Sequence, residues 1–435
     1  MKGNSRLRQL APLGMLAIAL LTLAACADSY PNTTFDPHSD LGRSIDSIWD
    51  RLLLLGTIVF VLVEVALLYV VFRYRHRPSD TSTPPQTHGN AFLEILWTII
   101  PAVILLFIAV PTVRVIFKTQ AKAVAGALEI QVIGHQWWWE FRYPEYNIVT
   151  ANEIYIPTGR TVNFKMTSQD VIHSFWIPQL AGKRDVIANR TNYIWFTPDT
   201  TLSASVWNGF CTEYCGASHA KMRFRVFTVK PDQFASWVAG QQRPAAFGAQ
   251  PNAPPPMLMP FPGARNDRAA PAPPPNPAAT TPTGAATASL ASAGPAYTFP
   301  QNQPEFDYAK PHTPIPAGLK FTPGLTGSAA RGQQVYSSAA CIGCHTITGN
   351  PMSMGVTGPN LTHFGSRATI GAGTFPNTPA YLALWIKNAR EMKPGILMPT
   401  LGKNEYDPQL KQAVTTGGLD DQQIADIVAY LTSLK

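Results

Sequence analysis

Charged residues and cysteines are both scarce in this sequence of 435 residues. Only 14% of the residues are charged and 46% are hydrophobic, which indicates that part of the chain lies in lipid rather than in water. The formal net charge is +8, but no basic face stands out, so we expect no nucleic-acid binding. The five cysteines are an odd number, so at least one lies outside any intramolecular disulfide framework. The length predicts two or three folded units joined by linkers.

The N-terminus has the layout of a secretory signal over residues 1–25. Three basic residues precede an apolar stretch at 10–23. The sequence then reads Leu-Ala-Ala-Cys up to Cys26, which resembles the lipobox of bacterial lipoproteins. This resemblance implies cleavage before Cys26 and attachment of lipid there. An ordinary signal peptide and an uncleaved anchor are the alternatives, but no other role suits an isolated cysteine at this place.

Two long apolar segments predict a pair of membrane-spanning helices. Residues 52–72 contain one charged residue, Glu64, and residues 95–113 contain none, so each crosses a hydrocarbon core of about 30 Å. We expect the second span to cover about 95–116. The basic run at 73–77 follows the first span, so the positive-inside rule places the connecting loop in the cytoplasm and everything after the second span outside. We interpret Glu64 as a protonated residue at an interface.

Residues 127–240 change to short β-rich runs separated by turn residues. Regular short strands of this kind predict a β-sandwich or a barrel. The expected strands lie at 129–133, 153–156, 161–167, 193–197, 204–207 and 224–229.

A cluster of soft ligands lies in this unit. The motif reads Cys211-Thr-Glu-Tyr-Cys215-Gly-Ala-Ser-His219-Ala-Lys-Met222, and His173 lies far upstream. Two thiolates, two imidazoles and a thioether suit copper better than magnesium or calcium. A disulfide between the cysteines would close a strained loop, and a structural zinc site would not require a methionine. Two cysteines four positions apart can instead bridge two copper ions, which delocalises an arriving electron and favours fast transfer.

These residues closely resemble subunit II of the haem–copper oxidases, whose cupredoxin domain carries the dinuclear copper A centre. The resemblance implies that the two cysteines bridge both copper ions. It also implies that His173 and Met222 complete one copper, and that His219 and the backbone carbonyl of Glu213 complete the other. The side chain of Glu213 would additionally reach a magnesium ion, Mg2+, shared with subunit I.

Two further stretches resemble the same family. In the aromatic segment at 134–141, the resemblance makes Trp137 the entry point for electrons from cytochrome c, while Trp138 departs from the family's more usual tyrosine. Core or membrane-interface roles are the alternatives, because alternating strand directions cannot bury three adjacent tryptophans on one face. Glu94, at the start of the second span, matches the family's glutamate at the mouth of a proton path into subunit I.

Proline, alanine, threonine and glycine fill residues 241–323. Such a stretch cannot bury a core, so we expect an extended or disordered tether. The units on either side have similar small positive charges, with 10 basic against 8 acidic residues at 128–230 and 8 against 6 at 324–435. We therefore expect tethering rather than electrostatic steering to bring them together.

The pattern Cys341-Ile-Gly-Cys344-His345 is the attachment motif of a c-type haem. Two thioether bonds would fix the ring, and His345 would be the proximal iron ligand. A redox or zinc-binding pair is the alternative, but export and the following histidine favour haem. Residues 324–435 resemble small bacterial cytochromes c, with helices expected at 329–337 and 420–434.

The sixth iron ligand should be a methionine well downstream, because thioether ligation raises the haem potential. Met398, followed by proline, fits the spacing of the cytochromes that this segment resembles. Met352 and Met354 lie very close to the attachment motif, and Met392 lacks the following proline. The same resemblance implies that the carbonyl of Pro359 accepts a hydrogen bond from the proximal histidine, with a plain turn as the alternative.

The whole pattern predicts a multi-domain membrane protein with a two-helix transmembrane hairpin at 26–126, a β-sandwich cupredoxin domain at 127–240 and an all-α cytochrome c domain at 324–435. It resembles subunit II of cytochrome c oxidases of the caa type. That resemblance implies a path from an external donor, such as cytochrome c or a bc-type complex, through haem c and copper A to haem a of subunit I, where oxygen is reduced to water and protons are pumped. It also implies other oxidase subunits and membrane lipid as partners, with both outer domains on the periplasmic side of a bacterial plasma membrane.

Three other functions were weighed against this one. A free-standing membrane-tethered electron carrier would need neither Glu94 nor the magnesium-reaching Glu213. Nitrous oxide reductase also carries copper A, but it has a large propeller domain rich in histidine, whereas this chain has only 9 histidines. Quinol oxidases of the same superfamily lack the copper ligands that are present here.

Overall fold

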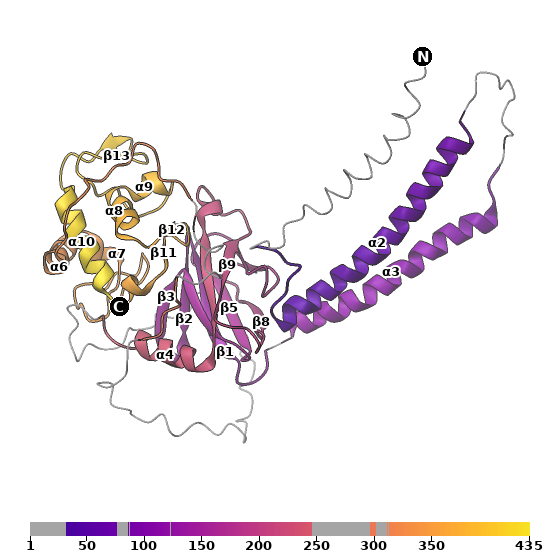
Figure 1. Ribbon diagram of the computed structural model, residues 1–435, viewed down its shortest axis with the longest axis horizontal. Helices are drawn as coiled ribbons and strands as arrows, with labels where there is room; N and C mark the ends of the chain where they lie inside the picture. Colours follow the sequence, from indigo (N-terminus) through magenta and orange to yellow (C-terminus); the bar gives the residue numbers. More distant parts are fainter. Residues whose placement is uncertain are drawn as a thin grey trace, which may run out of the picture.

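Three folded units follow one another along the chain (Figure 1). The predicted signal at 1–25 and the predicted lipid site Cys26 lie outside the described residues, as does most of the expected linker. The computed structural model describes residues 32–75, 86, 88–121, 123–245, 296–301, 311 and 313–435.

Two long helices form the N-terminal hairpin, α2 (Asp40–Arg73) and α3 (Ala91–Gln120) (Figure 1). They contain both predicted spans, and their apolar windows are not buried within the chain, as suits helices that face lipid or another subunit. Ser39 caps α2 by accepting a hydrogen bond from the amide of Gly42, and Asn90 caps α3 in the same way.

The hairpin is attached to the β-sandwich at its outer end. Arg43, in the first turn of α2, forms an ion pair with Asp199 of the sandwich at 2.7 Å. The indole of Trp195 donates a hydrogen bond to the carbonyl of Ala121, the residue that follows α3, at 2.9 Å. The sandwich therefore lies directly at the end of the hairpin (Figure 1).

Ten strands form the two five-stranded sheets of the predicted cupredoxin domain. One sheet has the order β3-β2-β1-β5-β8 and the other β4-β10-β9-β6-β7. The strands are β1 (Leu128–His135), β2 (Trp138–Tyr143), β3 (Ile148–Ala151), β4 (Glu153–Pro157), β5 (Val162–Ser168), β6 (His173–Trp176), β7 (Arg184–Val186), β8 (Asn192–Phe196), β9 (Ser205–Cys211) and β10 (Arg223–Val229), with short 3-10 turns η1 (Pro144–Tyr146) and η2 (His219–Lys221).

Aromatic rings from both sheets fill the core of the sandwich. Trp139 is fully buried and packs edge-on against Phe175 and Phe224, with ring centroids 5.7 Å and 5.6 Å apart. The neighbouring Trp138 points elsewhere and stacks on His135 at 4.1 Å. The adjacent tryptophans thus have different environments. The sequence pattern did not predict strand β2, because almost every residue in this strand is buried and the alternation of a half-exposed strand is missing.

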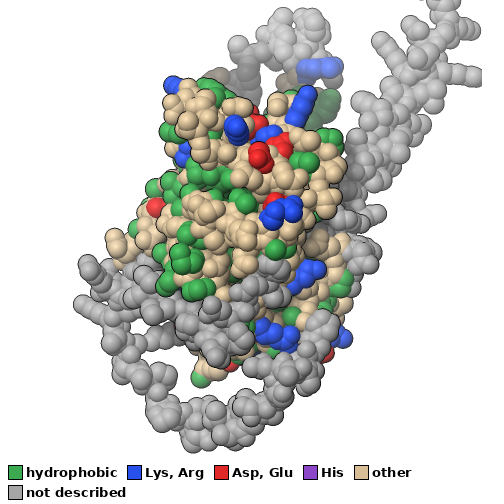
Figure 2. All heavy atoms as spheres, turned by 90° about the vertical axis from the view of Figure 1, so that its left-hand side faces the viewer, with side chains coloured by type: hydrophobic (Ala, Val, Ile, Leu, Met, Phe, Trp, Pro, Cys, Tyr) green, Lys and Arg blue, Asp and Glu red, His purple; other side chains and the backbone are tan. Residues whose placement is uncertain are grey.

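The C-terminal domain lies against the sandwich on the side away from the hairpin (Figure 1). Helices α6 and α10 cross closely, because a Cβ at Gly332 would meet the carbonyl oxygen of Asp426 at 1.9 Å. The outward face of this domain has hydrophobic side chains along one flank and charges of both signs on the other (Figure 2). Its elements are α6 (Ala329–Ser338), α7 (Cys341–Cys344), η4 (Phe364–Ser366), β11 (Thr369–Ile370), β12 (Phe375–Pro376), α8 (Pro379–Lys387), α9 (Ala389–Met392), β13 (Tyr406–Asp407), β14 (Gln412–Ala413) and α10 (Asp421–Ser433).

Parts of the predicted tether are packed rather than free. Phe299 is 2% exposed, and its amide donates to the hydroxyl of Tyr155 in β4 at 3.2 Å, next to helix α4 (Pro231–Gln241). Leu319 is also buried and belongs to the core of the C-terminal domain. The prediction that 241–323 is only an extended or disordered tether is therefore wrong for these residues, because isolated large apolar side chains in a Pro-rich segment can still pack on a preformed core.

Candidate metal and haem sites

Two neighbouring strands bring the predicted copper ligands together. His173 is the first residue of β6 and Cys211 is the last residue of β9, and the two strands pair with Phe175 opposite Cys211. The amide of Cys211 donates a hydrogen bond to the carbonyl of Met222 at 3.0 Å, which closes the loop between these two residues. Strand pairing thus makes neighbours of residues that are 38 positions apart.

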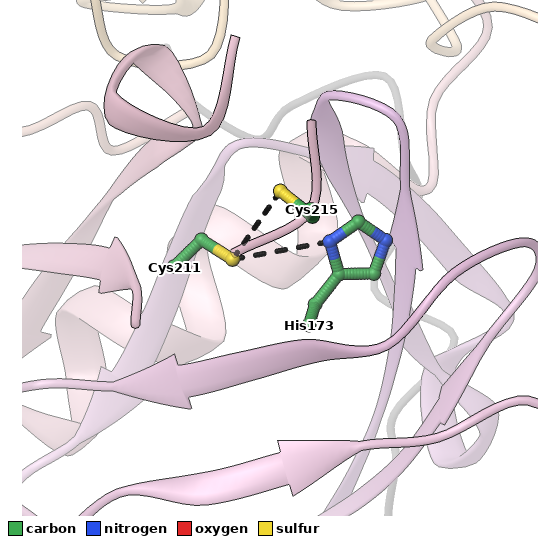
Figure 3. Close-up of side chains that lie close together, drawn as sticks. All are labelled: His173, Cys211 and Cys215. Atoms are coloured by element: carbon green, nitrogen blue, oxygen red, sulfur yellow. Dashed lines mark hydrogen bonds between the residues drawn. The ribbon is translucent and has the colours of Figure 1, made fainter. Parts of the chain in front are cut away.

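The centre of this cluster is a pair of thiols facing one imidazole (Figure 3). The Sγ atom of Cys211 lies 3.7 Å from that of Cys215 and 3.8 Å from Nδ1 of His173. Both thiols are free, and their separation is far longer than the roughly 2.05 Å of a disulfide. The alternative of a disulfide is therefore not present in this structure.

The remaining predicted ligands surround the same two sulfur atoms. Nδ1 of His219 lies 3.6 Å from Sγ of Cys215, and Sδ of Met222 lies 3.8 Å from it. The carbonyl oxygen of Glu213 accepts from the thiol of Cys211 at 3.3 Å. Two thiols, two imidazole nitrogens, a thioether and a carbonyl fit the donor set of a dinuclear copper site.

The two thiols have different pKa values. The hydrogen bond from Cys215 lowers the pKa of Cys211 to about 4, and the same contact raises the pKa of Cys215. A thiolate is the form of cysteine that binds metal. The cluster therefore already favours the ionised state of Cys211, one of the two cysteines predicted to bridge the copper ions.

Asp170 orients the buried histidine of this cluster. Its carboxylate accepts a hydrogen bond from Nε2 of His173 at 2.8 Å, which turns Nδ1 towards the thiols. Burial opposes protonation of His173, but the hydrogen bonds to Asp170 and Cys211 outweigh it and raise the pKa. The sequence reasoning assigned Asp170 no role, although a carboxylate three positions before a ligand histidine was a visible signal.

Trp137 lies directly on the loop of residues 211–222, which we call the copper loop because it carries most of the predicted copper ligands. Its indole Nε1 donates to the carbonyl of Cys215 at 2.8 Å, and the side-chain amide of Gln136 donates to the same oxygen at 2.8 Å. The tryptophan is only 8% exposed. The predicted surface entry point is thus covered in this chain, and what covers it is the C-terminal domain.

The haem-attachment motif opens onto an apolar cavity. Cys341 and Cys344 lie at the two ends of the short helix α7, and both thiols are free. Nδ1 of His345 donates to the carbonyl of Pro359 at 2.8 Å. The other ring nitrogen, Nε2, can therefore serve as the ligand to the haem iron. A Cβ at Gly358 would meet the His345 ring at 2.6 Å, so this glycine gives the imidazole its place.

Met398 lines the same cavity as the attachment motif. Its competitors do not: Met352 and Met354 are 64% and 75% exposed, and Met392 is buried in the hydrophobic core of the domain. The paired thiols, the oriented imidazole and a thioether across an apolar cavity fit a c-type haem. Trp137 of the copper domain also lines this cavity.

Two groups near these sites escaped the sequence reasoning. Lys393 is buried, and its ammonium group donates to the carbonyls of Trp137 at 2.6 Å and Gly371 at 3.1 Å. Burial lowers the pKa of Lys393 to about 7. Glu153, on β4, is 4% exposed and faces the C-terminal domain. No local pattern marks either residue, because the partners of each come from a distant segment.

Glu94 lies far from both sites. It is in the first turn of α3, exposed on the hairpin at the end away from the sandwich, and its carbonyl accepts from the hydroxyl of Thr98 at 2.8 Å. Within the described residues, nothing brings it near the predicted copper or haem ligands. Any role in proton uptake would therefore involve a partner subunit.

Three family models match the chain in succession. The model of the transmembrane domain of cytochrome c oxidase subunit II matches residues 34–115, and that of its periplasmic domain matches residues 147–229. The cytochrome c model matches residues 329–435. The matched segments lie in the helical hairpin, the β-sandwich and the C-terminal domain, and the match to the β-sandwich begins after strands β1 and β2.

Individual relatives match over most of the chain. Cytochrome c oxidase subunit 2 of Alkalihalophilus pseudofirmus is 28% identical, with 97% of this chain and 96% of the relative covered. Cytochrome c oxidase subunit 2 of Bacillus sp. strain PS3 is 30% identical, with 83% of this chain and 79% of the relative covered. The crystal structure of the periplasmic domain of subunit II of the Bradyrhizobium japonicum cytochrome oxidase matches at 30% identity and a TM-score of 0.26, covering 28% of this chain and 96% of that one.

Proposed function

The chain belongs to the cytochrome c oxidase subunit II family and carries a fused cytochrome c domain, and on this premise we propose that it conducts electrons from its haem site through Trp137 to copper A and on to haem a of subunit I. Its general role in electron transfer within an oxidase, with copper and haem as cofactors, follows from the family. The proposal concerns the particular path.

One observation carries this path. Trp137 lines the haem cavity, and its indole donates a hydrogen bond to the backbone carbonyl of Cys215, a copper ligand in this proposal. A single side chain therefore bridges the two sites. Apolar walls around the cavity and a buried copper cluster keep water away from both, which limits the rearrangement that accompanies a change of charge.

The cofactors would supply the one-electron redox chemistry, with haem c held in the haem site and a copper pair held by the thiol cluster. The chain's own residues then have defined tasks. His345 and Met398 would ligate the iron, with Pro359 fixing the imidazole. Asp170 fixes His173 in the copper cluster. These assignments come from the positions of the side chains and from the family.

Replacing Trp137 with phenylalanine tests the path. The Trp137→Phe change removes the indole N–H that contacts the copper loop, so we expect transfer from haem to copper to slow by at least an order of magnitude with metal contents unchanged. Flash-induced reduction of the haem in the purified oxidase measures this rate. The matched control is Trp138→Phe, because Trp138 also lines the cavity but stacks on His135 instead. Equal rates in both variants would contradict the path.

We include proton uptake at Glu94 in the proposal, since oxygen reduction and proton pumping in subunit I require a proton supply. The carboxylate is exposed at the inner end of α3, where a neighbouring subunit could accept protons from it. For Glu94→Gln we expect turnover to fall several-fold while haem-to-copper transfer keeps its native rate. Glu64→Gln is the control, as Glu64 lies within the span of α2. Unchanged turnover in Glu94→Gln would remove Glu94 from the proton path.

The remaining partners follow from position and family. The exposed Glu213 side chain could bind Mg2+ at the boundary with subunit I, and lipid on Cys26 would hold the N-terminus at the outer leaflet. The copper and haem domains would then face the periplasm, where a cytochrome c or a bc-type complex donates electrons. Co-purification with subunit I, with copper, haem and magnesium analysis, distinguishes this assembly from a free-standing electron carrier.

A further inference from the structure

The C-terminal domain is docked on the copper domain through a polar seam. We call residues 367–374 the docking loop. This loop turns sharply at Gly371, Ala372 and Gly373, which all have positive φ, of 61°, 62° and 66°. The carbonyl of Ala372 accepts from the amide of Arg223 at 3.1 Å, at the start of β10. The docking loop therefore joins the sandwich by a backbone hydrogen bond next to the loop that carries the predicted copper ligands.

Glu153 is a buried side-chain acceptor in this seam. Its Oε1 atom accepts from the amides of Ala368 at 3.0 Å and Thr369 at 2.8 Å, and from the Thr369 hydroxyl at 2.8 Å. All of these donors belong to the docking loop. Burial raises the pKa of Glu153, while these hydrogen bonds favour its charged form. A carboxylate desolvated in this way needs its donors, so its environment is complete only when the domains are docked.

Two guanidinium groups interact electrostatically with the same carboxylate from opposite domains, that of the buried Arg225 and that of the half-buried Arg367. Arg225, on β10, is paired in register with Glu153 across the sheet and donates to the carbonyl of Gly373 at 3.2 Å. Arg367 begins the docking loop. Burial lowers the pKa of both arginines to about 10, and the charge of Glu153 opposes this effect in each. Glu153 thus compensates one desolvated cation from each domain.

A second contact closes the seam over Trp137. A Cβ at Gly395, where φ is +85°, would come within 2.9 Å of the Trp137 ring, so the backbone lies directly on the indole. The hydroxyl of Ser218 donates to the carbonyl of Pro394 at 2.6 Å, and Lys221 donates to the carbonyl of Met392 at 2.8 Å. The segment that leads to Met398 therefore covers the electron entry residue.

We propose that Glu153 is a positioning residue that anchors the cytochrome domain on the copper domain, and that the closed seam reserves Trp137 for this chain's own haem site and denies it to soluble electron-donor proteins. The anchoring stands on the contacts alone. The reservation of Trp137 rests on the proposed function. Released from the anchor, the domain would separate from the sandwich and expose the tryptophan.

Hydrogen exchange in the intact oxidase tests the anchor. In Glu153→Gln an amide group replaces the charged acceptor, so we expect exchange of the Ala368 and Thr369 amides to quicken by roughly 10- to 100-fold. The matched control is Glu145→Gln, since Glu145 forms an exposed ion pair with Arg160 on the same domain. Similar exchange in the two variants would show that Glu153 does not anchor the domain.

A milder variant keeps this test available if Glu153→Gln fails to assemble. Thr369→Val removes only the hydroxyl hydrogen bond to Glu153 and leaves the carboxylate in place. We expect a smaller increase in exchange at residue 368. Combined with Glu153→Gln, the effect should be less than additive, because both changes remove the same interaction. If the effects of the two substitutions on exchange were fully additive, Glu153 and Thr369 would act independently, and the anchor would be refuted.

Reduction by a soluble one-haem cytochrome c tests the reservation of Trp137. In the native oxidase we expect copper reduction to follow haem reduction at a rate that does not rise with donor concentration. Glu153→Gln should add a second copper phase whose rate rises in proportion to the donor. A copper phase that depends on donor concentration in the native oxidase would overturn the reservation of Trp137. The same conclusion would follow if this phase were missing from a Glu153→Gln oxidase whose Ala368 and Thr369 amides exchange rapidly. If copper is never reduced through the haem, the proposed path fails while the exchange result stands.

Discussion

Replacing Cys215 with serine is expected to abolish the copper centre and the activity that depends on it. Cys215 contacts the other thiol, His219 and Met222, so a hydroxyl in its place removes the ligand that both metal ions would share. Loss of an outer partner of a metal site commonly costs 10- to 100-fold, so loss of a bridging ligand should lower turnover by roughly 100-fold or more. Copper analysis and oxygen uptake with an external donor measure the two effects.

The haem domain should remain functional in this variant. External donors would still reduce the haem, which would then stay reduced because its acceptor is missing. Tyr214→Phe is the matched control, since Tyr214 lies on the same loop, is 77% exposed and contacts the copper residues only through its ring near His219. A Cys215→Ser oxidase that retains two copper ions and native turnover would refute the copper assignment.

Replacing Met398 with histidine is expected to lower the haem potential strongly. Thioether ligation raises the potential of a c-type haem, and axial ligands set such potentials over a range of roughly 0.8 V. We expect a drop on the order of 0.1 V, where about 59 mV corresponds to a tenfold change for a one-electron couple. Reduction by a fixed external donor should therefore become more than tenfold less favourable. A redox titration of the haem absorbance measures the shift.

The competing methionines provide the control for this experiment. Met354→Leu changes a side chain that is 75% exposed and does not line the haem cavity. The reduction potential of the haem in this variant should therefore match that of the native protein. Loss of the absorbance band typical of sulfur-ligated haem should occur only in the Met398 variant. The opposite pattern, with the shift in Met354→Leu, would assign the sixth ligand to the loop beside the attachment motif.

The contact between the two outer domains is not visible in their net charges. Both domains are weakly positive, and the prediction that a tether brings them together by proximity stays a prediction. The structure adds a closed seam in which Glu153 accepts from the docking loop and Lys393 donates to the carbonyl of Trp137. Net charge could not reveal this, because a few buried, directional hydrogen bonds hardly change the sum of charges.

Local patterns were sufficient for most of the architecture. The two spans, six of the sandwich strands and the first and last helices of the cytochrome domain all appear where the patterns place them. The patterns missed β2, β3, β6 and β7, which are short or buried throughout and lack the alternation that marks a half-exposed strand. They also missed the packing of Phe299 and Leu319 within the linker.

The sequence by itself determined which atoms are available for chemistry, because Cys211, Cys215 and the 341–345 motif are recognisable from residue type and spacing. Only the tertiary structure decided which groups meet across long separations. It set His173 beside the thiols, turned it with Asp170, and covered Trp137 with the segment before Met398. The reason is physical: a short motif is fixed by local chain geometry, whereas a buried contact between domains depends on how two finished surfaces fit.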